Sequence, residues 1–360
     1  MIENNKKKDN SEELPAGGLL LESIIESIID EFINAFKKAL NKDEDLLDNA
    51  RKKAKERVLE AIAGCSENSR CWRKRLRASL DLAEQILDDI ASSLEQAESI
   101  YDAVLDLKFS LQGPGLVGAG SGLLRGIFEV GLEIDWRLGL PYYPASTVKG
   151  AVRSLAEELL GRDNAEKLFG RTGREGHMGL VTFYDAYPIG CDKKAPYPCL
   201  ILTGGVITPH YYSGGEPVKS EYEAMPNPIP HIVIAPGTVF RVVAGLKCPR
   251  EDYESIESLI NKLLGSKTRC NNNKGSCTCI YQYAIAVGIL VIKALGRGFA
   301  ARSGKGYNVL EPFTGELDKS IQNLRVYIPS STIFLRKNIG SPRSWGPGST
   351  RRRHSRRTAS

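Results

Sequence analysis

Residues 140–153 read LPYYPASTVKGAVR, and they mark the start of a helix that we expect over 146–160. Ser146 or Thr147 stands near the expected N-cap, where a side-chain hydroxyl can accept a hydrogen bond from a backbone N–H group. Lys149 and Arg153 are four residues apart and therefore project from one helix face. Free amides at a helix start also attract phosphate. The stretch predicts a helix that suits an anionic partner.

Short strands and further helices are expected on both sides of this helix. β-branched and aromatic residues predict strands over 104–111, 179–186 and 238–245, helical patterns cover 251–264 and 281–295, and a final strand is expected over 307–311. The order strand, helix, strand, strand, helix, strand indicates an α+β domain of the ferredoxin-like, split βαβ plan with long insertions. The sheet of this plan is also the RNA platform of RNA-recognition (RRM-like) modules.

The first hundred residues have a different texture and predict an N-terminal helical region. Leu20, Ile24, Ile28, Phe32 and Phe36 recur every four residues and form one wide apolar stripe. Two more helical stretches are expected over 43–63 and 73–105, and the second carries an apolar face that includes Leu80 and Leu87. We expect these helices to pack on the core of the following domain or on a neighbouring protein.

Charge is distributed unevenly along the chain. The net charge is +6, but residues 341–360 contain six arginines and no acid, so 1–340 is neutral. This excludes a uniformly basic surface. Residues 1–106 sum to −7 and 107–340 to +7, so the predicted α+β domain is basic. The arginine-rich tail is expected to be disordered.

A glycine-rich segment follows the last expected helix. Residues 296–307 read GRGFAARSGKGY. The spacing is wrong for a phosphate-binding P-loop, and the helix-before-strand order is the reverse of a dinucleotide fingerprint. A flexible loop remains, with bare amides and the cations Arg297, Arg302 and Lys305, and this combination suits a phosphodiester backbone. A tight connection with incidental charges is the alternative.

Cysteine and histidine give no defined centre. Cys270, Cys277 and Cys279 lie close together with Cys248 upstream, and their spacing leaves inert thiols, disulfides and a zinc site open. His177, His210 and His231 are dispersed and show no metal-hydrolase pattern. We expect no catalytic residue, no metal and no cofactor. No uncharged helical run approaches the roughly 20 residues of a membrane span, and no signal-peptide core is present, so a cytoplasmic protein without a membrane partner is expected.

Several ordered motifs resemble the RAMP superfamily of CRISPR proteins. Residues 140–153 resemble its "lPyiPgSsiKGalR" signature, 179–188 (GLVTFYDAYP) its next strand, and 298–307 its C-terminal glycine-rich loop. Residues 208–212 (TPHYY), the proline-rich 225–230 and 236–240 (PGTVF) resemble the sixth-subunit family of the type III-B (Cmr) effector. Ala145 departs from the usual glycine, and Ala300-Ala301-Arg302 departs from the common Ala-Lys-Thr.

The resemblance implies a non-catalytic, RNA-binding structural subunit of a ribonucleoprotein for antiviral RNA targeting. It implies binding near the 3′ end of the guide RNA, at the end of the backbone filament. The implied partners are CRISPR guide RNA, target RNA, other Cmr RAMP subunits and the small helical subunit. The insertion 189–234 would be a thumb-like hairpin that wedges a flipped nucleotide. The resemblance and the chemistry of the glycine-rich loop together predict these RNA-contacting residues: Ser146, Lys149, Arg153, Gly296, Arg297, Gly298, Arg302, Ser303, Gly304, Lys305 and Tyr307.

Two other functions are compatible with the sequence. One is a RAMP-type endoribonuclease that processes guide precursors, with a histidine such as His210 as general acid or base. The other is a purely architectural subunit that touches protein only. The expected organisation is an N-terminal helical region at 1–105, the RAMP domain at 106–320, a C-terminal segment at 321–340 and the basic tail at 341–360.

Overall fold

The computed structural model describes most of the chain between residues 69 and 334. The described ranges are 69–96, 100–121, 127–174, 176–192, 201–208, 228–249, 253–273, 276–313, 324–328 and 331–334, with isolated residues or short pieces within 49–59, 125, 212–220 and 251. The predicted apolar stripe of 20–36, the tail 341–360 and His210 lie outside the described residues. None of the described helices is long and apolar enough to cross a membrane.

An antiparallel sheet is built around two long strands, β1 (Ala103–Leu111) and β12 (Thr238–Leu246). They pair from Ala103 with Leu246 to Ser110 with Val239. The flanking strands are β6 (Val181–Phe183), β7 (Tyr187–Cys191), β15 (Leu310–Pro312), β16 (Leu324–Ile328) and β17 (Ser331–Phe334). Strands β6 and β7 pair with β12, whereas β15 and β16 pair with β1. Every residue of β1 and β12 is buried, so both faces of the sheet are covered.

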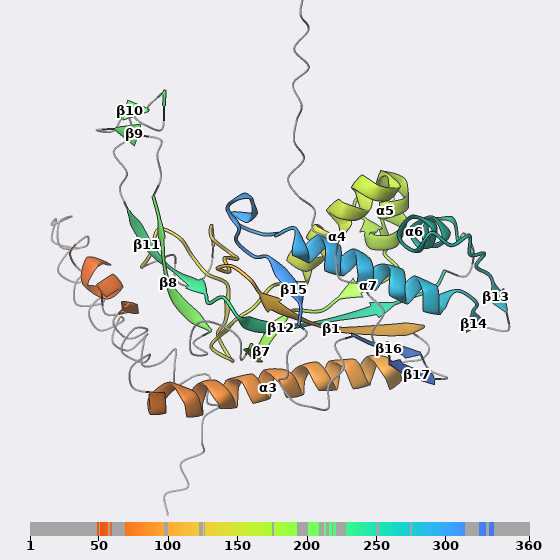
Figure 1. The fold of residues 1–360 in the computed structure, drawn as a ribbon, viewed down its shortest axis with the longest axis horizontal. Coiled ribbons are helices and arrows are strands. Elements are labelled where there is room, and N and C mark those ends of the chain that lie inside the picture. The colour runs from red at the N-terminus through yellow and green to blue at the C-terminus, as the bar shows by residue number, and fades with distance from the viewer. Residues whose placement is uncertain are drawn as a thin grey trace, which may run out of the picture.

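Helices form a layer on each face of the sheet. They are α3 (Ser69–Gln96), α4 (Ala145–Leu160), α5 (Arg162–Phe169), α6 (Glu254–Leu264) and α7 (Ile280–Gly296). Figure 1 shows α3 along one face and α4 and α7 on the other. Alternate side chains of β1 divide between these layers: Leu105 and Phe109 join the core under α4 and α7, whereas Val104 joins Leu87 of α3. The predicted α+β domain is confirmed, and its sheet is antiparallel.

Two buried cations of the sheet, Arg241 and Lys108, pair with acids of α3. The Arg241 guanidinium donates from Nε and Nη2 to the two carboxylate oxygens of Asp106, each at 2.9 Å, and from Nη1 to Asp88 of α3 at 2.7 Å. Lys108 Nζ lies 3.5 Å from Glu84 of α3, and burial lowers the pKa of Lys108. The predicted packing of N-terminal helices on the core is therefore confirmed for α3. Because α3 covers this face of the sheet, the face is not open for base stacking as it is in an RNA-recognition module.

The predicted insertion 189–234 contains a long hairpin. Its arms are β8 (Leu202–Ile207) and β11 (Ile229–Ile234), which pair antiparallel over their whole lengths, and the short strands β9 (Tyr212–Ser213) and β10 (Glu216–Pro217) form a second pair beyond them. Figure 1 shows the hairpin projecting away from the sheet. Its base is fixed by two backbone hydrogen bonds between Ile234 and Gly115, of 2.8 and 2.9 Å.

Three further short pairs complete the described strands. They are β2 (Ile134–Asp135) with β3 (Leu140–Pro141), β4 (Gly170–Arg171) with β5 (His177–Met178), and β13 (Asn272–Asn273) with β14 (Ser276–Cys277).

Three sequence-based boundaries need correction. The helix expected to reach residue 105 ends at Gln96, because β1 already begins at Ala103. The strand expected over 179–186 is shortened to β6, because Ala186 exchanges two backbone hydrogen bonds with Tyr143, and β7 begins only at Tyr187. The strand expected over 307–311 begins only at Leu310, and it is not the last, because β16 and β17 follow.

Candidate nucleic-acid interface

The start of α4 is already complemented by an acid. The helix begins at Ala145, with Pro144 as N-cap residue and no side-chain hydrogen bond from Ser146 or Thr147 to the cap. The Asp185 carboxylate accepts a hydrogen bond of 2.7 Å from the Ala145 N–H group, and the N–H groups of Thr147 and Val148 donate to the Pro144 carbonyl. The expected capping by Ser146 or Thr147 is therefore wrong. A carboxylate, rather than free amides, stabilises this helix end.

The glycine-rich loop after α7 has an unusual backbone. Gly298 and Gly306 have φ of +80° and +82°, a region that glycine adopts without cost. Ala300, Arg302 and Asn308 also have positive φ, of 55°, 60° and 56°. Each such non-glycine residue costs roughly 1–3 kcal/mol and persists only where its surroundings fix it. The loop is therefore held in one shape.

Asn308 is the residue that fixes this shape. Its side chain is fully buried and makes four hydrogen bonds: Oδ1 accepts from Leu116 N–H at 2.7 Å and Tyr143 O–H at 2.9 Å, and Nδ2 donates to the carbonyls of Leu116 at 3.0 Å and Ala301 at 2.8 Å. Asn308 thus joins the glycine-rich loop to the 113–116 segment and to Tyr143, two residues before α4. It uses the full hydrogen-bonding capacity of an amide side chain.

Tyr143 supports the same junction from the core. Its ring packs between Phe240 and Phe299, with ring centroids 4.8 and 4.9 Å apart. Burial raises the pKa of Tyr143 above its ordinary value, so its hydroxyl remains a hydrogen-bond donor to Asn308. The motif YYP and the glycine-rich loop are therefore one unit, although about 160 residues separate them.

The outer side of the loop offers donors and cations. Within the described part of the chain, the backbone N–H groups of Ala300 and Ala301 donate to no protein acceptor. Arg302 and Lys305 are exposed and make no ion pair with a described residue, and the Arg302 guanidinium lies 5.7 Å from the Tyr307 ring centroid. Bare amides beside cations are the groups that bind a phosphodiester backbone without reading its sequence.

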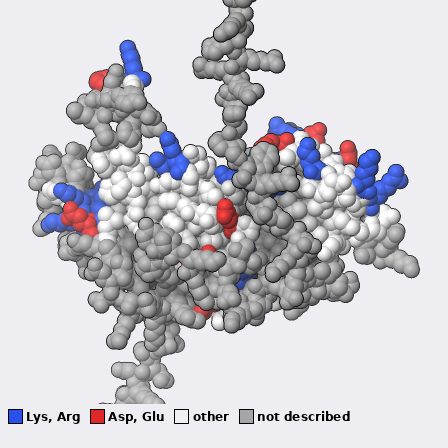
Figure 2. Space-filling model, in the orientation of Figure 1, with Lys and Arg blue, Asp and Glu red and all other residues white. Residues whose placement is uncertain are grey.

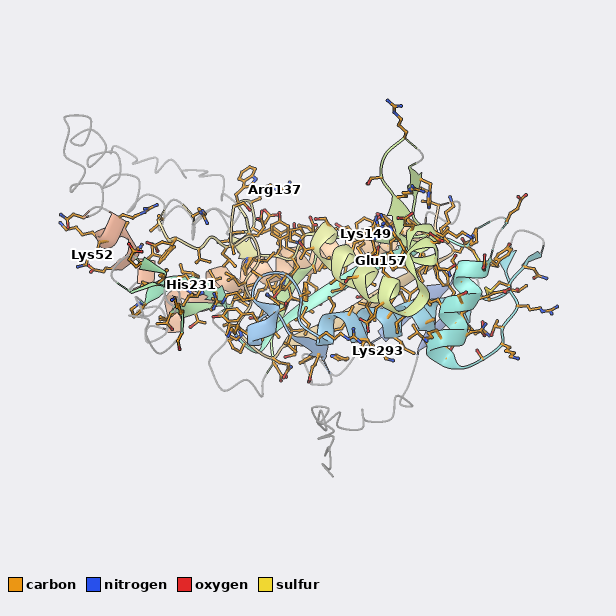
Figure 3. All side chains as sticks on the ribbon, turned by 90° about the horizontal axis from the view of Figure 1, so that it is seen from above. Lys52, Arg137, Lys149, Glu157, His231 and Lys293 are labelled. Atoms are coloured by element: carbon orange, nitrogen blue, oxygen red, sulfur yellow. A yellow bond between two sulfur atoms is a disulfide. The ribbon has the colours of Figure 1, made fainter. Side chains whose placement is uncertain are left out.

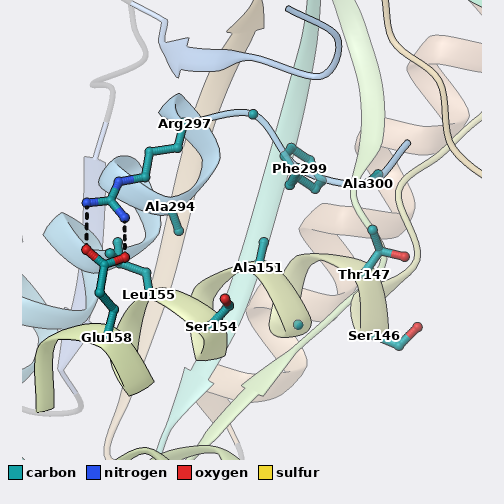
Figure 4. A pocket seen from close by; sticks show the side chains of 12 residues that line it. Ser146, Thr147, Ala151, Ser154, Leu155, Glu158, Ala294, Arg297, Phe299 and Ala300 are labelled. Carbon is teal, nitrogen blue, oxygen red and sulfur yellow. Dashed lines mark hydrogen bonds and ion pairs between the residues drawn. The ribbon is translucent and has the colours of Figure 1, made fainter. Parts of the chain in front are cut away.

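A groove joins the loop to α4. It has a volume of about 400 Å³, and small side chains dominate both walls: Ser146, Thr147, Gly150, Ala151 and Ser154 from α4, and Ala294, Gly298 and Ala300 opposite. Figure 4 shows α4 and the loop facing each other across this space, with Phe299 between them. Small side chains leave room for the backbone of a bound chain to approach both α4 and the glycine-rich loop. The structure thus brings Ser146, Arg297 and Gly298 of the predicted set together.

One end of the groove is closed by an ion pair. Arg297 Nη1 lies 2.6 Å from Glu158 Oε2, and Nη2 lies 3.4 Å from Oε1. Hydrogen bonding with Arg297 lowers the pKa of the exposed Glu158 carboxyl. Both side chains are more than half exposed, so the pair competes with water and contributes little to stability. Arg297 is accordingly available to an incoming anion that displaces Glu158.

Lys149 and Arg153 lie on a different side of α4 from the groove. Neither residue lines it. Arg153 donates from Nε to Glu157 at 2.8 Å and from Nη1 to the Gly170 carbonyl at 3.1 Å, and its Nη2 lies 3.6 Å from Glu166 of α5. Arg153 is therefore occupied with protein acceptors in this structure. Lys149, labelled on α4 in Figure 3, is half-buried and has no ion-pair partner among the described residues.

Charges on the visible surface are scattered. Figure 2 shows separate Lys and Arg groups around a mostly uncharged area on the described part of this face. A long basic stripe is absent from this view of the described residues. Contacts to an anionic chain on this face therefore depend on local groups such as those of the glycine-rich loop.

The two described histidines, His177 and His231, have different surroundings. His177 is exposed in β5, and its Nε2 lies 3.1 Å from the Glu166 carbonyl. His231 is buried in the β11 arm of the hairpin, away from Lys149 in Figure 3, and burial lowers its pKa so that the neutral ring is favoured. Neither residue is paired with a second titratable group in the manner of an acid–base couple.

Two residues of this site, Asn308 and Asp185, were not predicted from the sequence. Asn308 carries no periodic signal, although asparagine beside a Gly-Tyr turn is a common choice for positive φ. Asp185 lies 40 residues from the helix it caps, so no local capping pattern reveals it. Both depend on contacts between distant segments.

Comparison with known proteins identifies the class. A family model described as the RAMP superfamily matches residues 108–274. The CRISPR system CMR subunit Cmr6 of Saccharolobus solfataricus is 31% identical over 233 residues, which are 63% of this chain and 72% of that protein. The chain with its antiparallel sheet and glycine-loop groove is thus a RAMP superfamily protein. Within the superfamily it belongs to the family of Cmr6, the type III-B subunit.

One solved structure supports the same fold. A chain in the cryo-EM structure of the type III-B Cmr-beta bound to cognate target RNA is 23% identical, with a TM-score of 0.55, and the match covers 87% of this chain and 98% of that chain. The crystal structure of Cmr6 from Pyrococcus furiosus is 19% identical with a TM-score of 0.30, covering 59% and 99% respectively.

Proposed function

We propose that this chain is a non-catalytic, RNA-binding subunit of a type III-B Cmr effector and holds guide RNA by its backbone in the groove between α4 and the glycine-rich loop. The observation that carries the proposal is the junction at Asn308, which fixes the glycine-rich loop along a groove with a wall of small residues. Arg302 and Lys305 follow closely after Ala300, the last loop residue that lines the groove. Membership in the Cmr6 family indicates the complex to which the chain belongs, because the Saccharolobus solfataricus relative is a subunit of a CMR system.

The strand order supports a ferredoxin-like plan for the domain. Strands β15, β1, β12 and β6 with β7 lie in that order, and α4 and α7 connect β1 to β6 and β12 to β15. This is the split βαβ arrangement with the second helix adjoining the glycine-rich loop. The domain binds RNA at the helix and loop edge rather than on the sheet, because α3 covers one face and α4 and α7 cover the other.

The position of the subunit in the complex is inferred from its family. The subunit binds guide RNA near its 3′ end, ends the backbone filament and contacts target RNA, neighbouring RAMP subunits and the small helical subunit in the cytoplasm. The β8–β11 hairpin acts as the thumb that separates a nucleotide from the stack. Sequence specificity comes from base pairing of the guide, since amides and cations on a phosphate backbone carry no base information.

Removing both loop cations should weaken guide binding and its salt dependence. Arg302→Ala with Lys305→Ala removes two phosphate-binding charges, so we expect the slope of log K against log salt to fall by about one to two, equally for unrelated guide sequences. RNA retention by the reconstituted assembly, measured at several salt concentrations, checks this.

A charge-matched pair provides the control. Lys262→Ala with Lys267→Ala removes the same charge from exposed positions at the end of α6 and just after it. Equal losses in the two double variants would mean that only net charge matters, and no loss in either would remove the loop from the interface.

Gly304→Val tests close approach of the RNA backbone. No atom lies within 4 Å of a side chain started at Gly304, and its φ is not positive, so the fold has room for valine. The added methyl groups would occupy the space in front of the bare amides. We expect guide retention to fall severalfold with an unchanged melting temperature. Gly120→Val, at a similarly open and exposed glycine, is the matched control. Normal retention by Gly304→Val would make the loop a mere connector.

A further inference from the structure

Four buried cysteines meet at the end of the sheet remote from the hairpin. Cys248 follows β12, Cys270 lies between α6 and α7, Cys277 ends β14, and Cys279 precedes α7. Their exposed fractions are 8%, 8%, 5% and 0%. In the structure they form two disulfides, Cys248–Cys277 and Cys270–Cys279.

The two pairs share one centre. The Sγ atoms of Cys277 and Cys279, which belong to different disulfides, are 3.7 Å apart. The Sγ atoms of Cys248, Cys277 and Cys279 all lie within 4.8 Å of one another, and Cys270 is joined to Cys279. Zinc binds thiolates at about 2.3 Å in a tetrahedron, which places the sulfur atoms roughly 3.8 Å apart. The Cys277–Cys279 separation already matches this spacing, whereas the two sulfur atoms of each disulfide must move apart before all four can enclose a single zinc ion.

The backbone around the cysteines is held independently of the sulfur bonds. The Cys248 N–H group donates to Asp102 and the Cys270 N–H group to Glu257, each at 2.7 Å. The short turn that carries Cys277 and Cys279 is closed by hydrogen bonds in both directions between Asn271 and Thr278, each of 3.0 Å. Such support keeps the ligands in place whether or not the sulfur atoms are joined.

The start of helix α7 favours a thiolate at Cys279. Cys279 is the N-cap residue of the 17-residue helix α7, whose first turn contains no acid. The positive end of a helix dipole stabilises a thiolate.

We propose that Cys248, Cys270, Cys277 and Cys279, when reduced, form a structural site for one Zn²⁺. Each disulfide takes up two electrons and two protons from a reductant such as a dithiol, which is itself oxidised to a disulfide. One Zn²⁺ then forms four bonds to sulfur, and the protons of the thiols are released to solvent. The ion replaces the disulfides as the link between the end of β12 and the start of α7. The site is separate from the RNA groove and does not depend on it.

Metal analysis of the full chain tests the site. The protein is purified under reducing conditions, dialysed against metal-free buffer and measured for zinc, and its cysteines are counted by alkylation after denaturation with a chelator. We expect about one zinc per chain and alkylation of all four cluster cysteines. Cobalt added to the reduced, zinc-free chain should give the visible absorption and sulfur-to-metal charge-transfer bands of a tetrahedral thiolate site.

The double variant Cys270→Ser with Cys277→Ser removes one sulfur from each disulfide and should lose the zinc. Cys191→Ser, outside the cluster, should retain it. The cobalt spectrum of the unaltered chain remains decisive if the double variant fails to fold. A reduced chain without zinc and without the cobalt bands would overturn the proposal, as would zinc retained by the folded double variant or disulfides that resist the reductant.

Discussion

Asn308→Leu should lower the free energy of unfolding by about 3 kcal/mol or more. The substitution removes four buried hydrogen bonds and leaves the Leu116 N–H group and the carbonyls of Leu116 and Ala301 without their partner. Each buried polar group left unpaired costs roughly 1–3 kcal/mol. Leucine at a φ of 56° adds about 1–2 kcal/mol of backbone strain. Equilibrium urea unfolding of the two proteins measures the difference.

A second substitution separates backbone strain from hydrogen bonding. Asn308→Gly accepts the positive φ but lacks the amide, so we expect a smaller loss, of about 2 kcal/mol. Both variants should also weaken guide retention, because the glycine-rich loop loses its attachment to Tyr143 and Leu116. A loss below about 0.5 kcal/mol for Asn308→Leu would show that this network does not hold the loop.

Arg241→Met should destabilise the fold by about 3–5 kcal/mol. Arg241 is 3% exposed, and its removal leaves the equally buried Asp106 without a counter-charge. Burial alone would lower the pKa of Arg241, but hydrogen bonds with Asp106 and Asp88 raise it above the ordinary value, so the guanidinium stays charged. Thermal and urea unfolding should both show the loss, and α3 should detach from the sheet first because Asp88 is released.

A double variant and a control variant complete this test. Arg241→Met with Asp106→Leu should regain much of the stability, because an apolar pair of similar volume avoids the uncompensated charge. Arg162→Ala removes a largely exposed arginine and leaves Glu166 paired with Arg153 and Arg171, so it should cost at most about 0.5 kcal/mol. If Arg241→Met costs no more than Arg162→Ala, the buried pair does not anchor α3.

Local patterns in the sequence were enough for the main elements. The helix expected over 146–160 appears as Ala145–Leu160, and the strands expected over 104–111 and 238–245 appear as Ala103–Leu111 and Thr238–Leu246. These segments combine strong periodicity or β-branched content with clear ends, so neighbours reinforce their local preference. The glycine-rich loop was also visible, because glycine and cations are rare together inside regular elements.

The contacts of single polar side chains were not predictable in the same way. Lys149 and Arg153 share a helix face by spacing, but Arg153 meets Glu166 and the Gly170 carbonyl, which only the packing of α5 brings near. The strand expected over 179–186 is interrupted because Tyr143, from another segment, pairs with Ala186. Such outcomes depend on tertiary contacts, which a local pattern does not contain.

Site-specific photo-crosslinking tests the RNA groove most directly. A photoreactive amino acid is placed at Ala300, on the loop wall of the groove, or at Gln85, on the exposed side of α3 on the other face of the sheet, and each protein is assembled with labelled guide RNA. Our account predicts strong crosslinking to the guide from Ala300 and little from Gln85. Crosslinking from Gln85 with none from Ala300 would contradict it.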